Sequence, residues 1–435
     1  MNKRFLKGSA IVGLSSALLL SACSSAGKQE QPAAGGSAAQ DGPAKKVEFW
    51  YALSGSNGDV VKKIVEDYNK SQKKIQVEAV YVPQNERMEK LSVAVAAGNP
   101  PDLFTAGPPD LASLQGSHVL KSIDELAKTG SKKITKDDFL PVLDSVIVKD
   151  GTLWAAPISI GVTTTYYNEN LFKAAGISKA PETWDQLVET AQKLTDSSKG
   201  QYGILLPTKE VQNTAEIWFS FLGQAGGRVL TEDNKKAAFN SEAGVKALQL
   251  WVDLIQKYKV APLTQLDAAN ITQTFGAGKT GMFIGYPQWI ETTKDFPFTT
   301  KTARLPKGEK YATSLGGWYL VVPAQGKNTE GAYEFLTWLM QPTNAVKWNV
   351  GMGNLPAEQK TLDTKEYQDY TKQTPLLEAF NTALKSDIQP FPATDKYGKL
   401  TVSVAKAIVS ALYQKQTPKE ALDAAAAEVN KLLAQ

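Results

Sequence analysis

"KVEFWYAL" (46–53), "IQVEAVYV" (75–82) and "PDLFTAG" (101–107) are short β-rich segments that two helix-like segments separate. The first of these, "NGDVVKKIVEDYNKSQ" (57–72), repeats apolar residues with the 3.6-residue period of a helix, and "RMEKLSVAVAAG" (87–98) ends at a glycine. Strands that alternate with helices require crossover connections, so they predict a parallel sheet with helices on its faces. We therefore expect an α/β fold, with ligands beyond the carboxyl ends of the strands.

The N-terminus has the features of a bacterial export signal. Lys3, Arg4 and Lys7 precede an apolar run that is too short to span a bilayer comfortably. The run ends in "LSAC" (20–23), which resembles the lipobox of bacterial lipoproteins, and Cys23 is the only cysteine of the chain. We expect residues 1–22 to be a signal peptide and Cys23 to carry the lipid. The protein would then be extracytoplasmic and anchored to the outer face of the cell membrane.

The composition of the rest of the chain limits the kinds of binding partner that we expect. Residues 23–46 lack aromatic and β-branched residues, so we expect a flexible, lipid-anchored linker. Of the 48 basic residues, three lie in the signal, which leaves 45 against 44 acidic residues. A nearly neutral body is not the electrostatic pattern of a nucleic-acid-binding protein. The roughly 390 residues after the linker exceed what one core usually serves, so two domains are expected.

Six segments along the body resemble one family. They are "GNPPDLF" (98–104), "TTTYYNENLFKAAGI" (163–177), "PETWDQLVETAQKL" (181–194), "FGAGKTGMFIGYPQW" (275–289), "LGGWYLVVPAQGKNTEGAYEFLTWLM" (315–340) and "QTPKEALDAAAAEVNKLL" (416–433). In this order they look like the extracellular solute-binding proteins of ABC sugar importers, the maltose-binding-protein-like and glycerol-3-phosphate-binding-protein-like family. The resemblance covers essentially all of residues 47–435.

The resemblance implies a fold, a function and partners. The fold is the two-lobed periplasmic-binding-protein-like fold of class II, each lobe a mainly parallel sheet flanked by helices, with the ligand cleft between the lobes. Residues 47–156 and 283–317 would form the first lobe, and residues 157–282 and 318–435 the second. The implied protein is a monomer that captures a carbohydrate, such as a di- or oligosaccharide, and delivers it to the permease subunits of an ABC importer.

The segment "GAGKT" (276–280) also looks like part of a phosphate-binding loop. Such a loop needs a glycine five positions before Gly278, where this chain has Gln273, and it needs a strand before it and a helix after it. Here the preceding residues read as the end of a helix and the following ones as a strand. We therefore expect a surface turn, with Lys279 exposed, that leads a strand toward the cleft.

Sugar sites combine flat aromatic rings with planar polar side chains. Trp289 and Trp318 follow glycines near strand ends, so they are the preferred aromatic candidates, whereas Trp184, Trp251 and Trp338 lie on helical stripes and are expected in the core. The further candidates are strand-end, loop and helix-start residues. The complete set of expected ligand-binding residues is Trp50, Ser54, Asn57, Asn85, Thr105, Trp218, Trp289, Gly317, Trp318, Asp395 and Tyr397.

Two alternatives stay open. A glycerol-3-phosphate or glycerophosphodiester ligand would favour an arginine fork, and Arg87 is the one arginine beside a predicted cleft loop. Asp110 in that region is expected to cap a helix rather than to bind a ligand. A secreted carbohydrate-active enzyme is the other alternative, because paired carboxylates cannot be recognised from sequence. The single histidine, His118, has no partners for a metal site or a triad, so we expect no catalytic residue, no metal and no cofactor.

Overall fold

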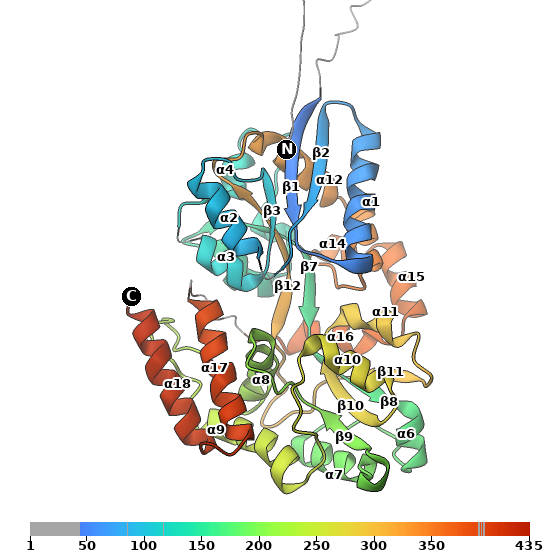
Figure 1. The fold of residues 1–435 in the computed structure, drawn as a ribbon. Helices are drawn as coiled ribbons and strands as arrows, with labels where there is room; N and C mark the ends of the chain where they lie inside the picture. Colours follow the sequence, from blue (N-terminus) through green and yellow to red (C-terminus); the bar gives the residue numbers. More distant parts are fainter. Residues whose placement is uncertain (1–43, 85, 116, 390–391, 393, 395) are drawn as a thin grey trace, which may run out of the picture. The chain divides into compact units, whose positions relative to one another are not determined.

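The computed structural model describes residues 44–435 except 85, 116, 390–391, 393 and 395. Its larger sheet holds the three strands that the opening segments predict, and β1 pairs in parallel with both β2 and β3 (Figure 1). The strand order is β2-β1-β3-β12-β4, and β7 also pairs with β12. The bounds are β1 (Lys45–Tyr51), β2 (Ile75–Tyr81), β3 (Leu103–Ala106), β4 (Leu120–Lys121), β7 (Ala156–Val162) and β12 (Leu315–Pro323).

The smaller sheet has the order β11-β8-β10-β9. Its strands are β8 (Thr164–Asn168), β9 (Tyr202–Leu205), β10 (Thr280–Gly285) and β11 (Thr300–Ala303), and a separate hairpin joins β5 (Val148–Lys149) to β6 (Thr152–Leu153). Only β9 and β10 pair in parallel, whereas β8 is antiparallel to both of its neighbours. In the larger sheet β12 is likewise antiparallel to β3, β4 and β7. The expectation of mainly parallel sheets is therefore wrong, because β8 and β12 arrive directly from the other sheet rather than through a crossover helix.

Helices cover both sheets. In the first half of the chain they are α1 (Gly55–Ser71), α2 (Arg87–Ala96), α3 (Pro108–Leu114), α4 (Ile123–Leu126), α5 (Asp144–Ile147), α6 (Glu169–Ala174), α7 (Trp184–Leu194) and α8 (Gln212–Gln224). The later ones are α9 (Glu242–Val252), α10 (Ala268–Gly276), α11 (Ile290–Thr293), α12 (Thr329–Leu339), α13 (Pro342–Met352), α14 (Gln359–Leu362), α15 (Lys365–Gln373), α16 (Leu377–Ser386), α17 (Tyr397–Leu412) and α18 (Pro418–Leu433). The short η turns are η1 (Lys136–Asp138), η2 (Pro141–Leu143), η3 (Ser197–Lys199), the π-helical η4 (Asp253–Lys257) and η5 (Pro287–Trp289). Within the described part of the chain, no helix is both long and apolar enough to cross a membrane.

Two antiparallel strands connect the sheets. β7 and β12 pair along Ala156–Val162 and Leu315–Leu320, with a bulge between Trp318 and Tyr319. Below this ribbon β7 leads into β8, and above it β12 joins β3 (Figure 1). One apolar core runs along the ribbon, since the same cluster contains Phe49 of β1 and Phe283 of β10. A second core, centred on Trp218 and Trp251, lies among α8, α9, α17 and α18.

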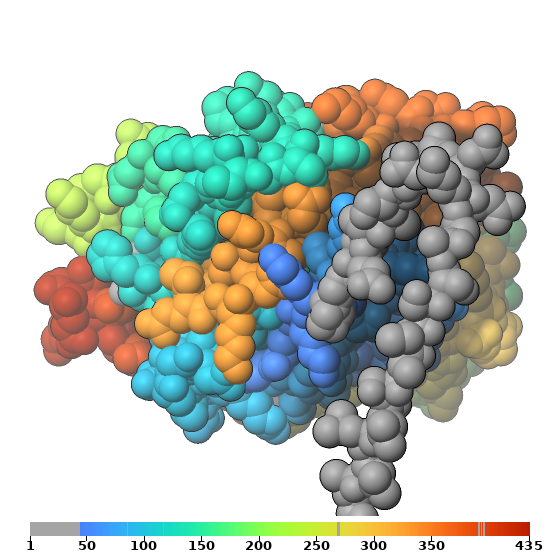
Figure 2. Space-filling view, turned by 90° about the horizontal axis from the view of Figure 1, so that it is seen from above, coloured from blue at the N-terminus to red at the C-terminus, as the bar shows by residue number. Residues whose placement is uncertain are grey.

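The strand pairing revises the expected lobes. The resemblance implies that residues 283–317 belong to the first lobe, but the end of β10 and all of β11 pair with β8 in the smaller sheet. It also implies that residues 318–435 belong to the second lobe, but α12 packs against β1 and α13 packs against α1. Figure 2 shows the orange residues around α12 beside the blue residues of the first strand. The apolar stripe of a helix does not encode which sheet it covers, so sequence patterns could not make this assignment.

The helix ends that the sequence predicts agree with the structure. Thr183 Oγ1 accepts a hydrogen bond from Gln186 N at 3.2 Å and caps α7. At α18, Thr417 N donates to Glu420 Oε2 at 2.9 Å, which completes the predicted capping box. The predicted turn at 276–280 is also confirmed, because α10 ends at Gly276, Lys279 is exposed and β10 begins at Thr280. This order excludes a phosphate-binding loop.

Candidate functional site

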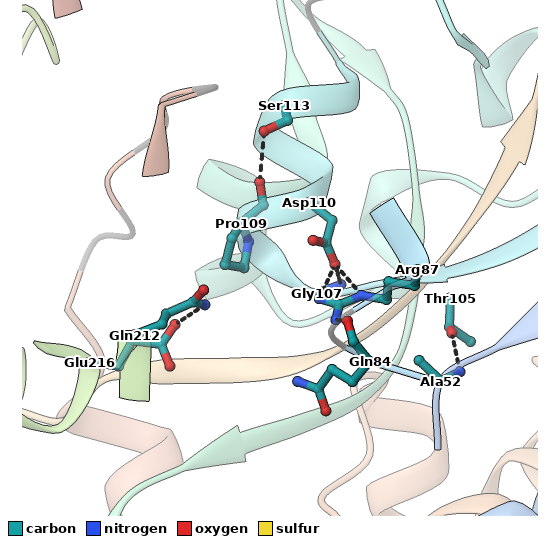
Figure 3. Close-up of polar contacts among 10 residues, drawn as sticks. All are labelled: Ala52, Gln84, Arg87, Thr105, Gly107, Pro109, Asp110, Ser113, Gln212 and Glu216. Atoms are coloured by element: carbon teal, nitrogen blue, oxygen red, sulfur yellow. Dashed lines mark hydrogen bonds and ion pairs between the residues drawn. The ribbon is translucent and has the colours of Figure 1, made fainter. Parts of the chain in front are cut away.

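The candidate site lies where the carboxyl ends of β1, β2 and β3 face the first turns of α8 and α17. α3, which follows β3, contacts α17 directly. Figure 3 shows Gln212 and Glu216 of α8 on one side and Arg87, Pro109 and Asp110 on the other. The loops on the larger sheet's side are tied together, since Ala52 N donates to Thr105 Oγ1 at 3.1 Å. This is the edge at which a parallel sheet positions a ligand.

A buried ion pair forms the floor on the larger sheet's side. Arg87 Nη2 lies 2.6 Å from Asp110 Oδ2, and the two side chains are only 11% and 8% exposed. Arg87 Nε donates to the same oxygen at 3.0 Å, and Gly107 N donates to it at 2.7 Å, so Asp110 also caps α3 as expected. Arg87 Nη1 donates to the carbonyl oxygen of Gln84. Three of the five N–H donors of Arg87 therefore bind protein acceptors, and Asp110 neutralises its charge, which makes this guanidinium a weak partner for a phosphate.

Glu216 is the principal carboxylate on the facing side. Its Oε1 accepts hydrogen bonds from Gln212 Nε2 at 2.8 Å and from Tyr397 Oη at 3.3 Å. Burial raises the pKa of Glu216 to about 7, and the fields of Asp110 and Arg87 act on it with opposite signs. Burial also raises the pKa of Tyr397 well above 10, so its hydroxyl remains a donor. Glu216 can thus hold a proton or a charge near neutral pH.

An aromatic corner lies at the end of β10. The ring of Tyr286 rests on two glycines of the connecting strands, with ring atoms 3.4 Å and 3.5 Å from the positions where a Cβ of Gly161 and of Gly316 would be. A Cβ at either position would be in ordinary van der Waals contact with the ring. Trp289 meets Tyr286 edge to face, with ring centroids 5.8 Å apart. Trp318 is half-buried, and the Arg87 guanidinium carbon lies 5.9 Å from its ring centroid.

The structure does not bring all the expected residues together. Trp50 is half-buried, but its Nε1 donates to Glu48, two residues back along β1. Trp218 has no exposed surface and belongs to the second core, so its side chain cannot reach a ligand in this structure. The physical reason is that α8 turns Glu216, two positions earlier, toward the site. Gly317 has φ 144°, and a Cβ there would collide with the carbonyl oxygen of Ser159, so the close β7 strand alone explains this glycine.

The remaining expected residues fall into two groups. Ser54 is exposed and precedes α1, and Asn57 is half-buried in the first turn of α1. Thr105 is fully buried, and its hydroxyl accepts a hydrogen bond from the loop that follows β1. Tyr397 is buried and contributes through its hydroxyl group. Cys23, Asn85 and Asp395 lie outside the described residues.

Sequence reasoning missed Glu216, Gln212 and the role of Arg87. The one available signal was a glutamate at the start of an otherwise apolar helix, "EIWFSFLG" (216–223). A carboxylate on such a helix is also consistent with a solvated first turn, so the sequence did not distinguish the two. For the described residues, no group of three or more His, Cys, Asp or Glu side chains has an arrangement that could hold a metal ion.

Comparisons with known proteins identify relatives over the whole body. The model of the bacterial extracellular solute-binding protein family matches residues 52–346. The chain is 25% identical over 425 residues to the sn-glycerol-3-phosphate-binding periplasmic protein of Pectobacterium atrosepticum, which covers 92% of this chain and 93% of that relative. It is 26% identical over 411 residues to the arabinooligosaccharide-binding protein of Bacillus subtilis, covering 88% and 92% of the two chains.

Solved structures show the same two-lobed fold. An ABC transporter solute-binding protein of Thermotoga lettingae, bound with α-D-tagatose, matches with a TM-score of 0.78 and 26% identity, covering 90% of this chain and all of that one. The cyclic α-maltosyl-1,6-maltose binding protein of Arthrobacter globiformis matches with a TM-score of 0.75 and 28% identity, covering 90% and 99%. The family match spans more than half of the chain and agrees with the fold. The protein belongs to the bacterial extracellular solute-binding protein family.

Proposed function

We propose that this protein is the substrate-binding component of an ABC importer and that its ligand is an uncharged carbohydrate, a di- or oligosaccharide. The proposal rests mainly on one observation, the closed ion pair of Arg87 with Asp110. This pair neutralises the arginine beside the site, while Glu216 faces the same space as an acceptor. Hydroxyl groups can donate to Glu216, whereas an anion would be repelled by its charged form.

Each of the other arginines in the described chain also has a carboxylate partner that offsets its charge. Arg228 pairs with Glu232, and Arg304 pairs with Asp387. The arabinooligosaccharide, cyclic maltosyl-maltose and tagatose relatives support a carbohydrate ligand, and the glycerol-3-phosphate relative supports the alternative of a phosphorylated ligand. The aromatic corner of Tyr286 and Trp289 favours the carbohydrate, because C–H faces of sugars pack on such rings.

We also propose that the protein has no enzymatic activity. Asp110 and Glu216 would be the two carboxylates of a glycoside hydrolase at this site, but Asp110 is held by Arg87 and by Gly107 N. Product analysis after incubation with each bound sugar tests this. Unchanged sugar is expected, and released products would support the enzyme instead.

The ligand proposal is tested by thermal unfolding and calorimetric titration against arabino-oligosaccharides, maltodextrins, tagatose and glycerol-3-phosphate. A ligand at a hundred times its dissociation constant should stabilise the protein by about 2.7 kcal/mol. We expect a carbohydrate to give this shift and glycerol-3-phosphate to give none. Tighter binding of glycerol-3-phosphate than of every sugar would overturn the proposal.

We propose that a lipid on Cys23 retains the protein at the cell surface as a monomer, where it can deliver its ligand to the permease. The support is the lipobox-like "LSAC" (20–23), followed by residues that cannot form a core. Cys23→Ser should release the protein from the membrane fraction or leave it unprocessed. A variant that is matured and still membrane-bound would refute the anchor without affecting the ligand proposal.

A further inference from the structure

A pocket opens beside the candidate site, and it shares two residues with that site. Glu216 of α8 and Tyr397 of α17, which are hydrogen-bonded to each other in the candidate site, also line this pocket. Its other walls are Phe219 of α8, the turn formed by residues 228–234, the start of β12 and Gln389. The empty space measures about 640 Å³, with the open mouth and the solvent in front of it included.

The pocket pairs an apolar surface with polar groups that have capacity for further hydrogen bonds. Phe219 and Leu315 supply part of the apolar surface. Gln389 Nε2 donates to the carbonyl oxygen of Phe219 at 2.9 Å. This bond orients the side-chain amide of Gln389 and leaves its Oε1 atom able to accept a hydrogen bond from a ligand. Glu216 Oε1 has two donors, whereas no described residue donates to its Oε2. Acceptors therefore lie on the α8 side of the pocket.

Hydrogen-bond donors lie on the opposite wall of the pocket, in the turn formed by residues 228–234. Arg228 binds Glu232 through Nη1, with 2.6 Å between the two atoms, and this pair leaves the other guanidinium donors of Arg228 without a partner among the described residues. Asn234 has a left-handed backbone, with φ 56°, and its backbone N donates to Thr231 O. Its side-chain amide makes no hydrogen bond with any residue that the structure describes. Donors and acceptors across an apolar surface suit a ring with hydroxyl groups on its rim and C–H groups on its faces.

Charge narrows the ligand class further. The Arg228–Glu232 pair adds no net charge, and Glu216 is neutral or negative. A phosphate or carboxylate would be repelled by the charged form of Glu216, and Glu232 offsets the positive charge of Arg228 opposite it. We infer that this pocket is an additional subsite for one glycosyl unit of an oligosaccharide whose remaining units occupy the cleft. This inference rests on the proposed carbohydrate function and adds a preference for longer sugars.

The test measures affinity as a function of sugar length. Calorimetric titration of the parent protein with maltodextrins and arabino-oligosaccharides of two to six units should show one unit whose addition strengthens binding about tenfold. Arg228→Ala and Asn234→Gly should each remove most of that step and change the affinity for the shorter sugars less than about twofold. Glycine is chosen at position 234 because it tolerates the positive φ.

Glu232→Ala is the matched control, since it breaks the same ion pair without removing a residue that lines the pocket. The Glu232→Ala variant should retain the roughly tenfold gain in affinity that one added sugar unit gives. If sugars bind but the step is absent, or survives in both Arg228→Ala and Asn234→Gly, the pocket is not a subsite and the proposed function stands. If no carbohydrate of any length binds the parent protein, the proposed function fails and the subsite fails with it. Thermal melting of each variant excludes unfolding as the cause.

Discussion

Arg87 and Asp110, which lie 23 positions apart in the chain, form a buried ion pair on the floor of the candidate site, with Nη2 and Oδ2 2.6 Å apart. The pair joins the start of α2 to the first turn of α3, so it fixes two loops that follow parallel strands. It also neutralises the one arginine that the sequence places beside the cleft. The ligand preference and the stability of this edge therefore depend on the same contact.

Asp110→Ala should lower the free energy of unfolding by about 3–5 kcal/mol, because Arg87 would remain buried without its partner. Urea unfolding measures the effect. Asp369→Ala, which removes an exposed pair with Lys365 on α15, is the control and should leave the unfolding midpoint nearly unchanged. An Asp110→Ala variant as stable as the parent would show that the loops do not depend on the pair.

Sugar binding should depend on the ionisation of Glu216, whose pKa is about 7. The groups that face it are Gln212, Tyr397, Asp110, Arg87 and Tyr286. An ionised carboxylate accepts stronger hydrogen bonds from hydroxyl groups than a neutral acid does. The affinity of the parent should therefore rise several-fold between pH 6 and pH 8. Glu216→Gln should show a flat profile in calorimetric titrations, and an equally steep profile in that variant would assign the titration to another group.

The aromatic side chains at the site should contribute to binding. Trp289→Ala and Trp318→Ala should each weaken sugar binding roughly ten- to hundredfold, because an aromatic face buried against a sugar contributes about 1–3 kcal/mol. Trp251 has no exposed surface and lies in the second core, so Trp251→Ala is the control. It should cost about 3–5 kcal/mol of stability and leave affinity little changed in the folded fraction. Parent-like affinity in both site variants would exclude these rings from the site.

Glu358 should make the protein less stable as the pH rises. Burial raises its pKa from 4.5 to about 8, with a further contribution from the nearby charge of Asp138. The folded state therefore holds a proton that the unfolded chain loses, so stability should fall by a few kcal/mol between pH 4.5 and pH 8 and then level off. Glu358→Gln should make this slope shallower in denaturant titrations and remove it between pH 7 and pH 8, because Glu216, with its pKa of about 7, adds to the slope only at lower pH. Glu366→Gln, at an exposed position on α15, should retain it.

Local patterns predicted a large part of the structure. The β-rich and amphipathic segments of residues 46–107 form β1 to β3 with α1 and α2 between them, and Thr183 and Thr417 cap the helices that they precede. The turn before β10 also followed from the order of a helix and a strand. These features depend on neighbours a few residues apart, whose geometry the backbone itself constrains.

Long-range packing determined the rest. The directions of β8 and β12, the packing of α12 on β1 and the complete burial of Trp218 depend on contacts between segments far apart in the chain. An apolar stripe indicates that a helix face is buried but not which surface buries it, and for that reason Trp218 could not be distinguished from a cleft residue. Glu216 became recognisable only when folding placed Tyr397, 181 positions later, against its carboxylate and Arg87 and Asp110 across the site. Its raised pKa arises from desolvation by those remote segments, and no short stretch of sequence contains them.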